Sequence, residues 1–104
     1  MSTQFDDVSI IKKANVYFDG KCISHGVVLP DGSKKTLGVI LPSKLRFNTR
    51  EAEVMEITSG KCRILPKGES DWKTVEAGQR FTIPADSWFD IEVSETVDYV
   101  CHYG

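Results

Sequence analysis

Short runs of alternating apolar and polar residues recur along this chain, and turn-forming residues separate them. In the run WFDIEV, Phe89, Ile91 and Val93 form one apolar row with acidic residues between them. Successive side chains of a strand point to opposite faces, so the alternation predicts a strand with one buried face. Turn residues such as PDGSKK, PKGESD and PADS punctuate the chain about every 6 to 10 residues, which is typical of antiparallel β-proteins.

We therefore predict an all-β domain with ten strands. The expected strands are 16–18, 22–29, 36–41, 44–49, 54–58, 61–65, 73–75, 80–83, 88–93 and 97–103. The stretch 8–14 is the one part that could be helical, and we interpret it as a turn or an extra strand. Ser59-Gly60 predicts a tight hairpin between its two flanking strands, because glycine allows a positive φ. Residues 1–9 are expected to be flexible within a single domain of residues 1–104.

The alternation also predicts which side chains point inward. In LRFNT, Leu45, Phe47 and Thr49 share one side of the strand, and in DYVCHY, Tyr99, Cys101 and Tyr103 do so. The predicted interior is aromatic and sparsely polar.

Length and charge narrow the function classes. A chain of 104 residues is long enough to bury the core of one domain. Its 13 basic and 15 acidic residues give a net charge of −2, which does not favour binding to a nucleic-acid polymer. It has no apolar run of the roughly 20 residues that span a bilayer, and MSTQFDDVS lacks the features of a signal peptide. These observations predict a cytoplasmic protein that does not bind membranes.

The three cysteines, Cys22, Cys62 and Cys101, are far apart in the sequence and odd in number. This arrangement fits neither a disulfide framework nor a paired-cysteine zinc site, so we expect buried free thiols. Cys101 and His102 are adjacent, but neighbours on a strand point to opposite faces. A nucleophile–base dyad is therefore disfavoured.

Two spaced motifs resemble those of the cupins, which are double-stranded jelly-roll barrels. Glu53-x6-Gly60 matches the end of the first cupin motif, and Gly78-x5-Pro84 matches the frame of the second. The resemblance implies a cupin fold, in agreement with the predicted strands.

The histidines that bind metal in metal cupins have no counterpart here. Residues 46–49 and Phe89 occupy the corresponding positions. Glu53 alone cannot hold a transition metal, which needs three or four converging ligands. We therefore expect no metal and no cofactor.

A closer resemblance covers nearly the whole chain. It is carried by N-x-YF-x-GK (15–21), F-x-T (47–49), E-x-M-x-x-x-SG (53–60), LP (65–66), W (72), AG-x-x-F-x-x-P (77–84), S-x-F (87–89) and Y-x-C-x-Y (99–103). Together these segments resemble the small cupin-type pyrimidine/purine nucleoside phosphorylases of bacteria. The chain departs from that pattern at His102, where the family has arginine, and in an N-terminal extension of about ten residues.

The resemblance implies a metal-free transferase of the glycosyltransferase type. It would convert a nucleoside and inorganic phosphate into a free base and ribose 1-phosphate, with tolerance of both purines and pyrimidines. It also implies a homodimer.

Glu53 is the predicted catalytic residue. Glycosidic cleavage develops positive charge on the ribosyl group, which a carboxylate can stabilise, and a carboxylate can also accept hydrogen bonds from ribose hydroxyls. The alternative is that Glu53 only ties down a neighbouring strand.

Phe47, Phe89, Tyr99 and Tyr103 are predicted to bind the base by stacking, which is worth roughly 1–3 kcal/mol per base and accepts every base. Such aromatic rows are also ordinary core. Thr49 and Ser87 are predicted to contact phosphate or ribose, although either can instead cap a turn.

Phosphate needs donors, and Arg is favoured for its planar fork. The predicted ligands are Lys21, Arg46 and His102, with Arg50 and Arg80 as further candidates. Alternation places Arg46 and His102 on faces opposite the interior, so they would be solvated or reach in from an edge or a partner subunit.

Two other functions remain open from the sequence. One is a non-catalytic, metal-free cupin that binds a small metabolite. The other is a metal-dependent cupin oxygenase or isomerase that uses unrecognised ligands. Phosphate-dependent turnover separates the enzyme from the binding protein.

Overall fold

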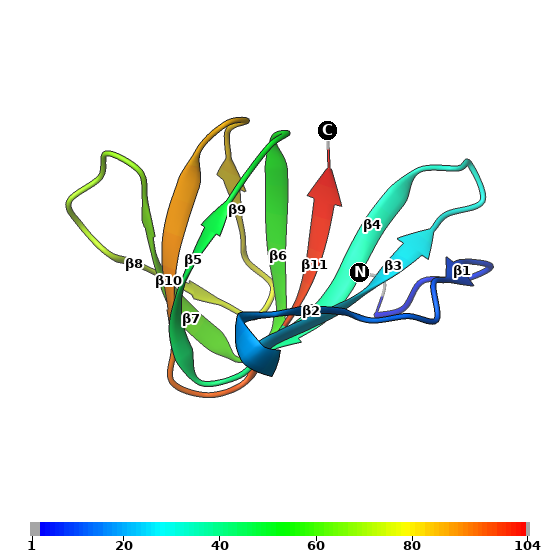
Figure 1. Ribbon diagram of the computed structural model, residues 1–104, viewed down its shortest axis with the longest axis horizontal. Helices are drawn as coiled ribbons and strands as arrows, with labels where there is room; N and C mark the ends of the chain where they lie inside the picture. Colours follow the sequence, from blue (N-terminus) through cyan, green and yellow to red (C-terminus); the bar gives the residue numbers. More distant parts are fainter. Residues whose placement is uncertain (1–2, 104) are drawn as a thin grey trace.

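A computed structural model describes residues 3–103, which form two antiparallel sheets (Figure 1). The strands are β1 (Ser9–Ile10), β2 (Asn15–Tyr17), β3 (Cys22–Val28), β4 (Lys34–Ile40), β5 (Ser43–Asn48), β6 (Glu53–Ser59), β7 (Lys61–Pro66), β8 (Lys73–Glu76), β9 (Arg80–Ile83), β10 (Trp88–Val93) and β11 (Val97–Tyr103). A short 3-10 turn, η1 (Phe18–Gly20), follows β2.

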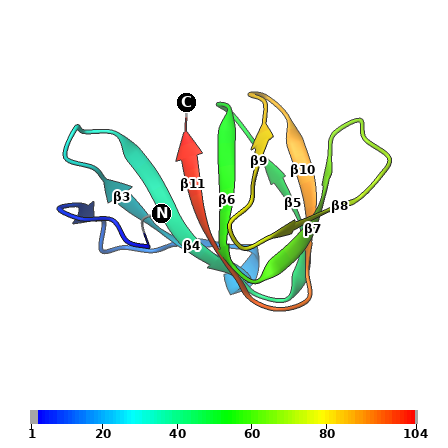
Figure 2. The same cartoon turned by 180° about the vertical axis from the view of Figure 1, so that it is seen from behind.

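The larger sheet has the order β1-β3-β4-β11-β6-β9, and the smaller one has the order β5-β10-β7-β8. β1 and β2 both pair with β3, one after the other along its free edge. The sheets face each other and share one core, to which both contribute, with Ile57 and Tyr99 from the larger sheet and Phe89 and Ile91 from the smaller. Viewed from behind, β11 lies centrally between β4 and β6 (Figure 2). The cupin fold is therefore confirmed.

The predicted strands are confirmed to within a few residues at their ends. Phe89, Ile91 and Val93 are buried, while the two acidic residues between them are partly exposed. The stretch 8–14 contains the short strand β1 and no helix.

The predicted hairpin at Ser59-Gly60 is wrong. β6 and β7 follow each other directly but belong to different sheets, with β6 paired to β11 and β9 and β7 paired to β10 and β8. Gly60 has a φ of 82°. A Cβ there would lie 2.8 Å from the Thr96 carbonyl oxygen. The glycine allows a sharp corner between the sheets.

The N-terminal segment follows the outer face of the larger sheet. Thr3, Gln4 and Phe5 line a groove of about 550 Å³ there, and Ser9 pairs with Val28. Residues 1 and 2 lie outside the described part of the chain, and the flexibility of residues 1–9 stays a prediction. Within residues 3–103, no helix is long and apolar enough to cross a membrane.

Candidate active site

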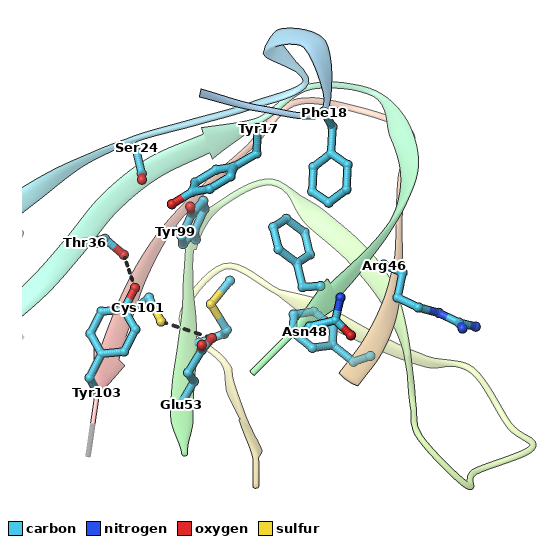
Figure 3. A pocket seen from close by; sticks show the side chains of 13 residues that line it. Tyr17, Phe18, Ser24, Thr36, Arg46, Asn48, Glu53, Tyr99, Cys101 and Tyr103 are labelled. Carbon is cyan, nitrogen blue, oxygen red and sulfur yellow. Dashed lines mark hydrogen bonds between the residues drawn. The ribbon is translucent and has the colours of Figure 1, made fainter. Parts of the chain in front are cut away.

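A cavity of about 330 Å³ opens between the two sheets (Figure 3). Its walls come from the inner face of the larger sheet, through β3, β4, β6 and β11, and from β5 and β10 of the smaller sheet. Tyr17 and Phe18, at the junction of β2 and η1, cover one side of it. This volume is at the lower end of the roughly 300–1,000 Å³ found for small-molecule sites.

One end of the cavity is built from phenylalanine rings. Phe47 stacks on Phe89 with ring centroids 5.5 Å apart and an interplanar angle of 18°. Phe18 lies with its ring centroid 5.2 Å from that of Phe47, and Phe81 lies 5.3 Å from Phe89, each in an edge-to-face contact. The four rings form a row that ends at the cavity mouth, in which Phe89 is 1% exposed and Phe18 is 41% exposed.

The other end carries hydroxyl groups. The Tyr103 hydroxyl lies 3.2 Å from Thr36 Oγ1, and the Tyr99 hydroxyl lies 3.4 Å from Cys22 Sγ. Ser24 also lines this end. Burial raises the pKa of both tyrosines, so they are uncharged hydrogen-bonding groups at neutral pH.

Glu53 brings a carboxyl group to the same end. It begins β6, and Cys101 Sγ of the adjacent β11 donates a hydrogen bond to its Oε1 at 3.4 Å. Partial burial raises the pKa of Glu53, an effect that the Cys101 hydrogen bond partly offsets. Burial and the nearby Glu53 charge raise the pKa of Cys101 to about 12, so its thiol keeps its proton.

The Tyr99 ring fits against the neighbouring strand because the residue opposite it there has no side chain. Gly38 of β4 is directly opposite Tyr99 in the β11 register. A Cβ on Gly38 would lie 2.9 Å from Tyr99 Cε1 and 2.6 Å from the Ile23 carbonyl oxygen. The tyrosine ring therefore occupies space that any other residue at position 38 would fill.

The structure brings together five of the residues predicted for catalysis and substrate binding. Glu53, Phe47, Phe89, Tyr99 and Tyr103 all line the one cavity. Their roles stay predictions, but their convergence is the arrangement that those roles require.

Several lining residues were missed in the sequence analysis: Tyr17, Phe18, Ser24, Thr36, Asn48 and Met55. Alternation within strands 22–29 and 36–41 could have indicated Ser24 and Thr36, since each shares a face with buried neighbours. No local pattern indicates Phe18, which lies in a turn.

Thr49 and Ser87 lie outside the cavity lining. The buried Thr49 hydroxyl donates to the Pro84 carbonyl oxygen at 2.7 Å and accepts from the Ser87 main-chain N–H at 3.0 Å. The Thr49 N–H in turn donates to the Ser87 carbonyl oxygen at 2.9 Å. This pair fastens the loop before β10 to the end of β5, which is the turn-capping alternative.

The predicted phosphate ligands do not converge on the cavity either. Arg46 is itself among the residues that line the cavity, but its guanidinium points away from it (Figure 3). It makes two hydrogen bonds to Asp90, at 2.7 and 3.1 Å, and lies over Trp88 at 3.8 Å from the ring centroid.

Lys21 is exposed beyond η1, outside the lining. His102 is on the opposite face of the larger sheet, as alternation predicts. Its Nδ1 lies 2.7 Å from Lys35 Nζ, and its Nε2 lies 2.9 Å from Glu56 Oε1. Its side chain is therefore separated from the cavity by the sheet itself.

Within residues 3–103, no group of three or more His, Cys, Asp or Glu side chains is placed to hold a metal ion. The polar side chains of the cavity are hydroxyls, one thiol, the Glu53 carboxyl group and the Asn48 amide, besides Arg46, whose guanidinium points away.

Comparisons with known proteins agree on one family. The family model described as pyrimidine/purine nucleoside phosphorylase matches residues 12–103. A protein with that name from Janthinobacterium sp. (strain Marseille) is 64% identical over 103 residues, covering 99% of both chains. Another from Paraburkholderia xenovorans (strain LB400) is 65% identical over 102 residues, covering 98% of this chain and 96% of that one.

Solved structures extend the likeness. A protein of unknown function (DUF1255) from Acinetobacter sp. ADP1 superposes with a TM-score of 0.97 at 52% identity, covering 99% of this chain and all of that one. Bacillus subtilis oxalate decarboxylase superposes with a TM-score of 0.72 at 16% identity, covering 99% of this chain and 30% of that one, which shows the fold alone.

Proposed function

Because the chain belongs to the pyrimidine/purine nucleoside phosphorylase family, we propose that the cavity between its sheets is the site of nucleoside phosphorolysis. The observation that supports this site is the division of one small cavity into a phenylalanine end and a hydroxyl and carboxyl end. A nucleoside is divided in the same way, into a flat base and a hydroxylated sugar.

The base lies at the phenylalanine end, on the Phe47 and Phe89 rings. Stacking contributes roughly 1–3 kcal/mol per base and does not depend on the base's hydrogen-bonding edge. A site that instead hydrogen-bonded that edge would reject the wrong base strongly. A base site made of aromatic rings should therefore accept both purines and pyrimidines.

In the reaction, a phosphate oxygen forms a bond to C1′ of the ribose while the C1′–N bond breaks and its electron pair leaves with the base. The base nitrogen then takes up a proton, which hydrogen phosphate itself can supply. The products are the free base and ribose 1-phosphate.

Glu53 is the catalytic residue in this proposal. Its carboxyl group is in the cavity beside the hydroxyls that surround the sugar, where a negative charge stabilises the developing ribosyl cation. It can also accept hydrogen bonds from ribose hydroxyls. A partly desolvated carboxylate interacts with such a cation more strongly than an exposed one does.

Phosphate binds at the hydroxyl end, where Ser24, Thr36 and Tyr103 can donate hydrogen bonds. Lys21 and His102 are left out of this proposal, and Arg46 is left out because its guanidinium is bound to Asp90. Neutral donors hold an anion less tightly than an Arg fork does, so phosphate affinity is expected to be modest.

The test is turnover of inosine and uridine by the purified protein, with and without inorganic phosphate. Free base and ribose 1-phosphate should appear together, and only when phosphate is present. Glu53→Gln should lower the rate, whereas Glu95→Gln, at an exposed acid outside the cavity lining, should not. Base release without phosphate would indicate hydrolysis, and no release from any common nucleoside would favour a metabolite-binding protein.

We further propose that the reaction needs no metal, because the cavity's polar groups act on sugar and phosphate directly. Dialysis against a chelator, followed by elemental analysis and assay, should leave the rate unchanged. A rate that falls and returns with one added metal would favour the metal-dependent alternative.

The chain is also proposed to work as a single-domain homodimer in the cytoplasm. Edge strands leave backbone donors and acceptors open for pairing, and exposed apolar residues such as Ile10, Val16 and Leu37 are available for burial. Light scattering measures the mass, and cell fractionation measures the location.

A further inference from the structure

The turn at the cavity mouth has an unusual backbone. Phe18 and Asp19 have φ values of 53° and 54°, and Gly20 follows at 89°. Two consecutive non-glycine residues in the left-handed region are energetically costly. The Lys21 N–H closes the turn by donating to the Phe18 carbonyl oxygen at 3.1 Å.

This backbone places the Phe18 ring over the cavity. Figure 3 shows Tyr17 and Phe18 descending from the turn toward the opening. Phe18 meets Phe47 edge to face at an interplanar angle of 80°, and yet it remains 41% exposed. A large apolar ring that is partly exposed at a cavity mouth can bury more of its surface against a ligand that enters the cavity.

The other aromatic walls cannot move in the same way. Phe89 is 1% exposed and lies between Phe47 and Phe81, inside a close-packed core. The turn, in contrast, follows a three-residue edge strand whose residues are all exposed and pair only with β3. The Phe18 wall is therefore the part of the aromatic end that is able to shift.

We propose that Phe18 is a specificity-determining residue, which closes the outer side of the base slot and shifts to accept either a one-ring or a two-ring base. This inference rests on the proposed function. A cavity of about 330 Å³ leaves little spare room, so a larger base needs a wall that gives way.

Direct binding of free uracil and free hypoxanthine tests this proposal, measured by titration calorimetry on the whole protein. Phe18→Ala removes the wall and should weaken both bases at least about fivefold, the equivalent of the lower bound for one stacking contact. Phe18→Trp narrows the slot and should weaken hypoxanthine more than uracil. Val16→Ala, an exposed apolar residue on the same edge strand but outside the lining, should change neither.

Turnover gives a second readout. Loss of a contact that is equally strong in the ground and transition states raises KM and leaves kcat unchanged, and this is the split expected for Phe18→Ala. Unchanged base affinity in Phe18→Ala, or equal effects of Phe18→Trp on the two bases, would overturn the proposal. Failure of the wild type to bind either base would also overturn it.

The two proposals fail differently. Base binding that depends on Phe18 without phosphate-dependent turnover would refute phosphorolysis and leave the role of Phe18 in place. Phosphate-dependent turnover with no effect of Phe18 on base affinity would refute the role of Phe18 and support phosphorolysis.

Discussion

Replacement of Gly38 by alanine should both destabilise the protein and disturb the cavity. The added Cβ would lie 2.6 Å from the Ile23 carbonyl oxygen, 2.9 Å from Ser24 Cβ and 2.9 Å from Tyr99 Cε1. The first of these is a backbone atom of the adjacent strand β3, so it cannot rotate away. The strands must separate or the Tyr99 ring must move.

Overpacking of this kind typically costs about 1–3 kcal/mol of the free energy of unfolding. In a domain of about 100 residues, each kcal/mol lowers Tm by about 4–8 °C, so Tm should fall by roughly 4–24 °C. Movement of the Tyr99 ring should also raise the KM for nucleosides, because its hydroxyl lies at the polar end of the cavity.

Gly26→Ala is the matched control, since Gly26 is in the neighbouring strand β3 and also has no positive φ. Its added Cβ would meet only the side chain of Ile11, at 3.0 Å, and that side chain is 52% exposed and free to turn. Thermal unfolding of both variants measures the difference. A Gly38→Ala protein as stable as Gly26→Ala, with unchanged KM, would refute the packing argument.

Three further predictions concern Glu53, Thr49 and Arg46. Glu53→Gln should lower kcat roughly 10²-fold. The pKa of Glu53 in the folded protein is above its ordinary value of 4.5, so the free energy of unfolding of the wild type falls as pH rises from 4.5 through the folded-state pKa. Gln does not titrate. Denaturant titrations should therefore show the variant gaining stability relative to the wild type over that pH range. Thr49→Val should cost about 1–3 kcal/mol in a denaturant titration because it leaves the Ser87 N–H unpaired, while Ser87→Ala, which keeps that N–H, should cost little; equal costs would contradict this. Arg46→Ala should leave the KM for phosphate unchanged in steady-state assays, since its guanidinium binds Asp90 outside the cavity, and a large rise in that KM would restore Arg46 as a phosphate ligand.

The strands were predictable because their signal is local. A period of two in the side chains identifies a strand and its buried face without knowledge of its partners. The same rule placed Tyr99, Cys101 and Tyr103 together and His102 opposite them, which the structure confirms.

Strand pairing was not predictable in the same way. Ser59-Gly60 permits a sharp reversal of the chain, but the same positive φ also fits a corner between two sheets. The choice depends on which distant strands offer a hydrogen-bonding edge, and β11 and β10 come about 30 residues or more after the turn. A local turn signal cannot contain that information.

The partner of Arg46 could not be predicted from the sequence. Alternation placed its side chain on the face opposite the interior, and Arg46 was selected as a phosphate ligand for the charge and planar fork of its guanidinium. Its cross-strand partner in β10 is Asp90, and Trp88 lies two residues away on the same strand. On the outer face, the guanidinium of Arg46 is paired with Asp90 and lies over the Trp88 ring. The residue type alone therefore did not show that Arg46 makes these contacts in place of binding phosphate.

The positions of Glu53 and Arg46 determine the electrostatics of the cavity. Among the described residues, the cavity lining holds the carboxyl group of Glu53 and no guanidinium or ammonium directed inward. In the proposed site, phosphate and a Glu53 carboxylate repel each other, so phosphate would be held weakly before the glycosidic bond stretches. As positive charge develops on the ribosyl group between them, both anions are attracted to it. The same absence of inward cations that weakens ground-state binding of phosphate therefore favours the transition state, which is the difference on which catalysis depends.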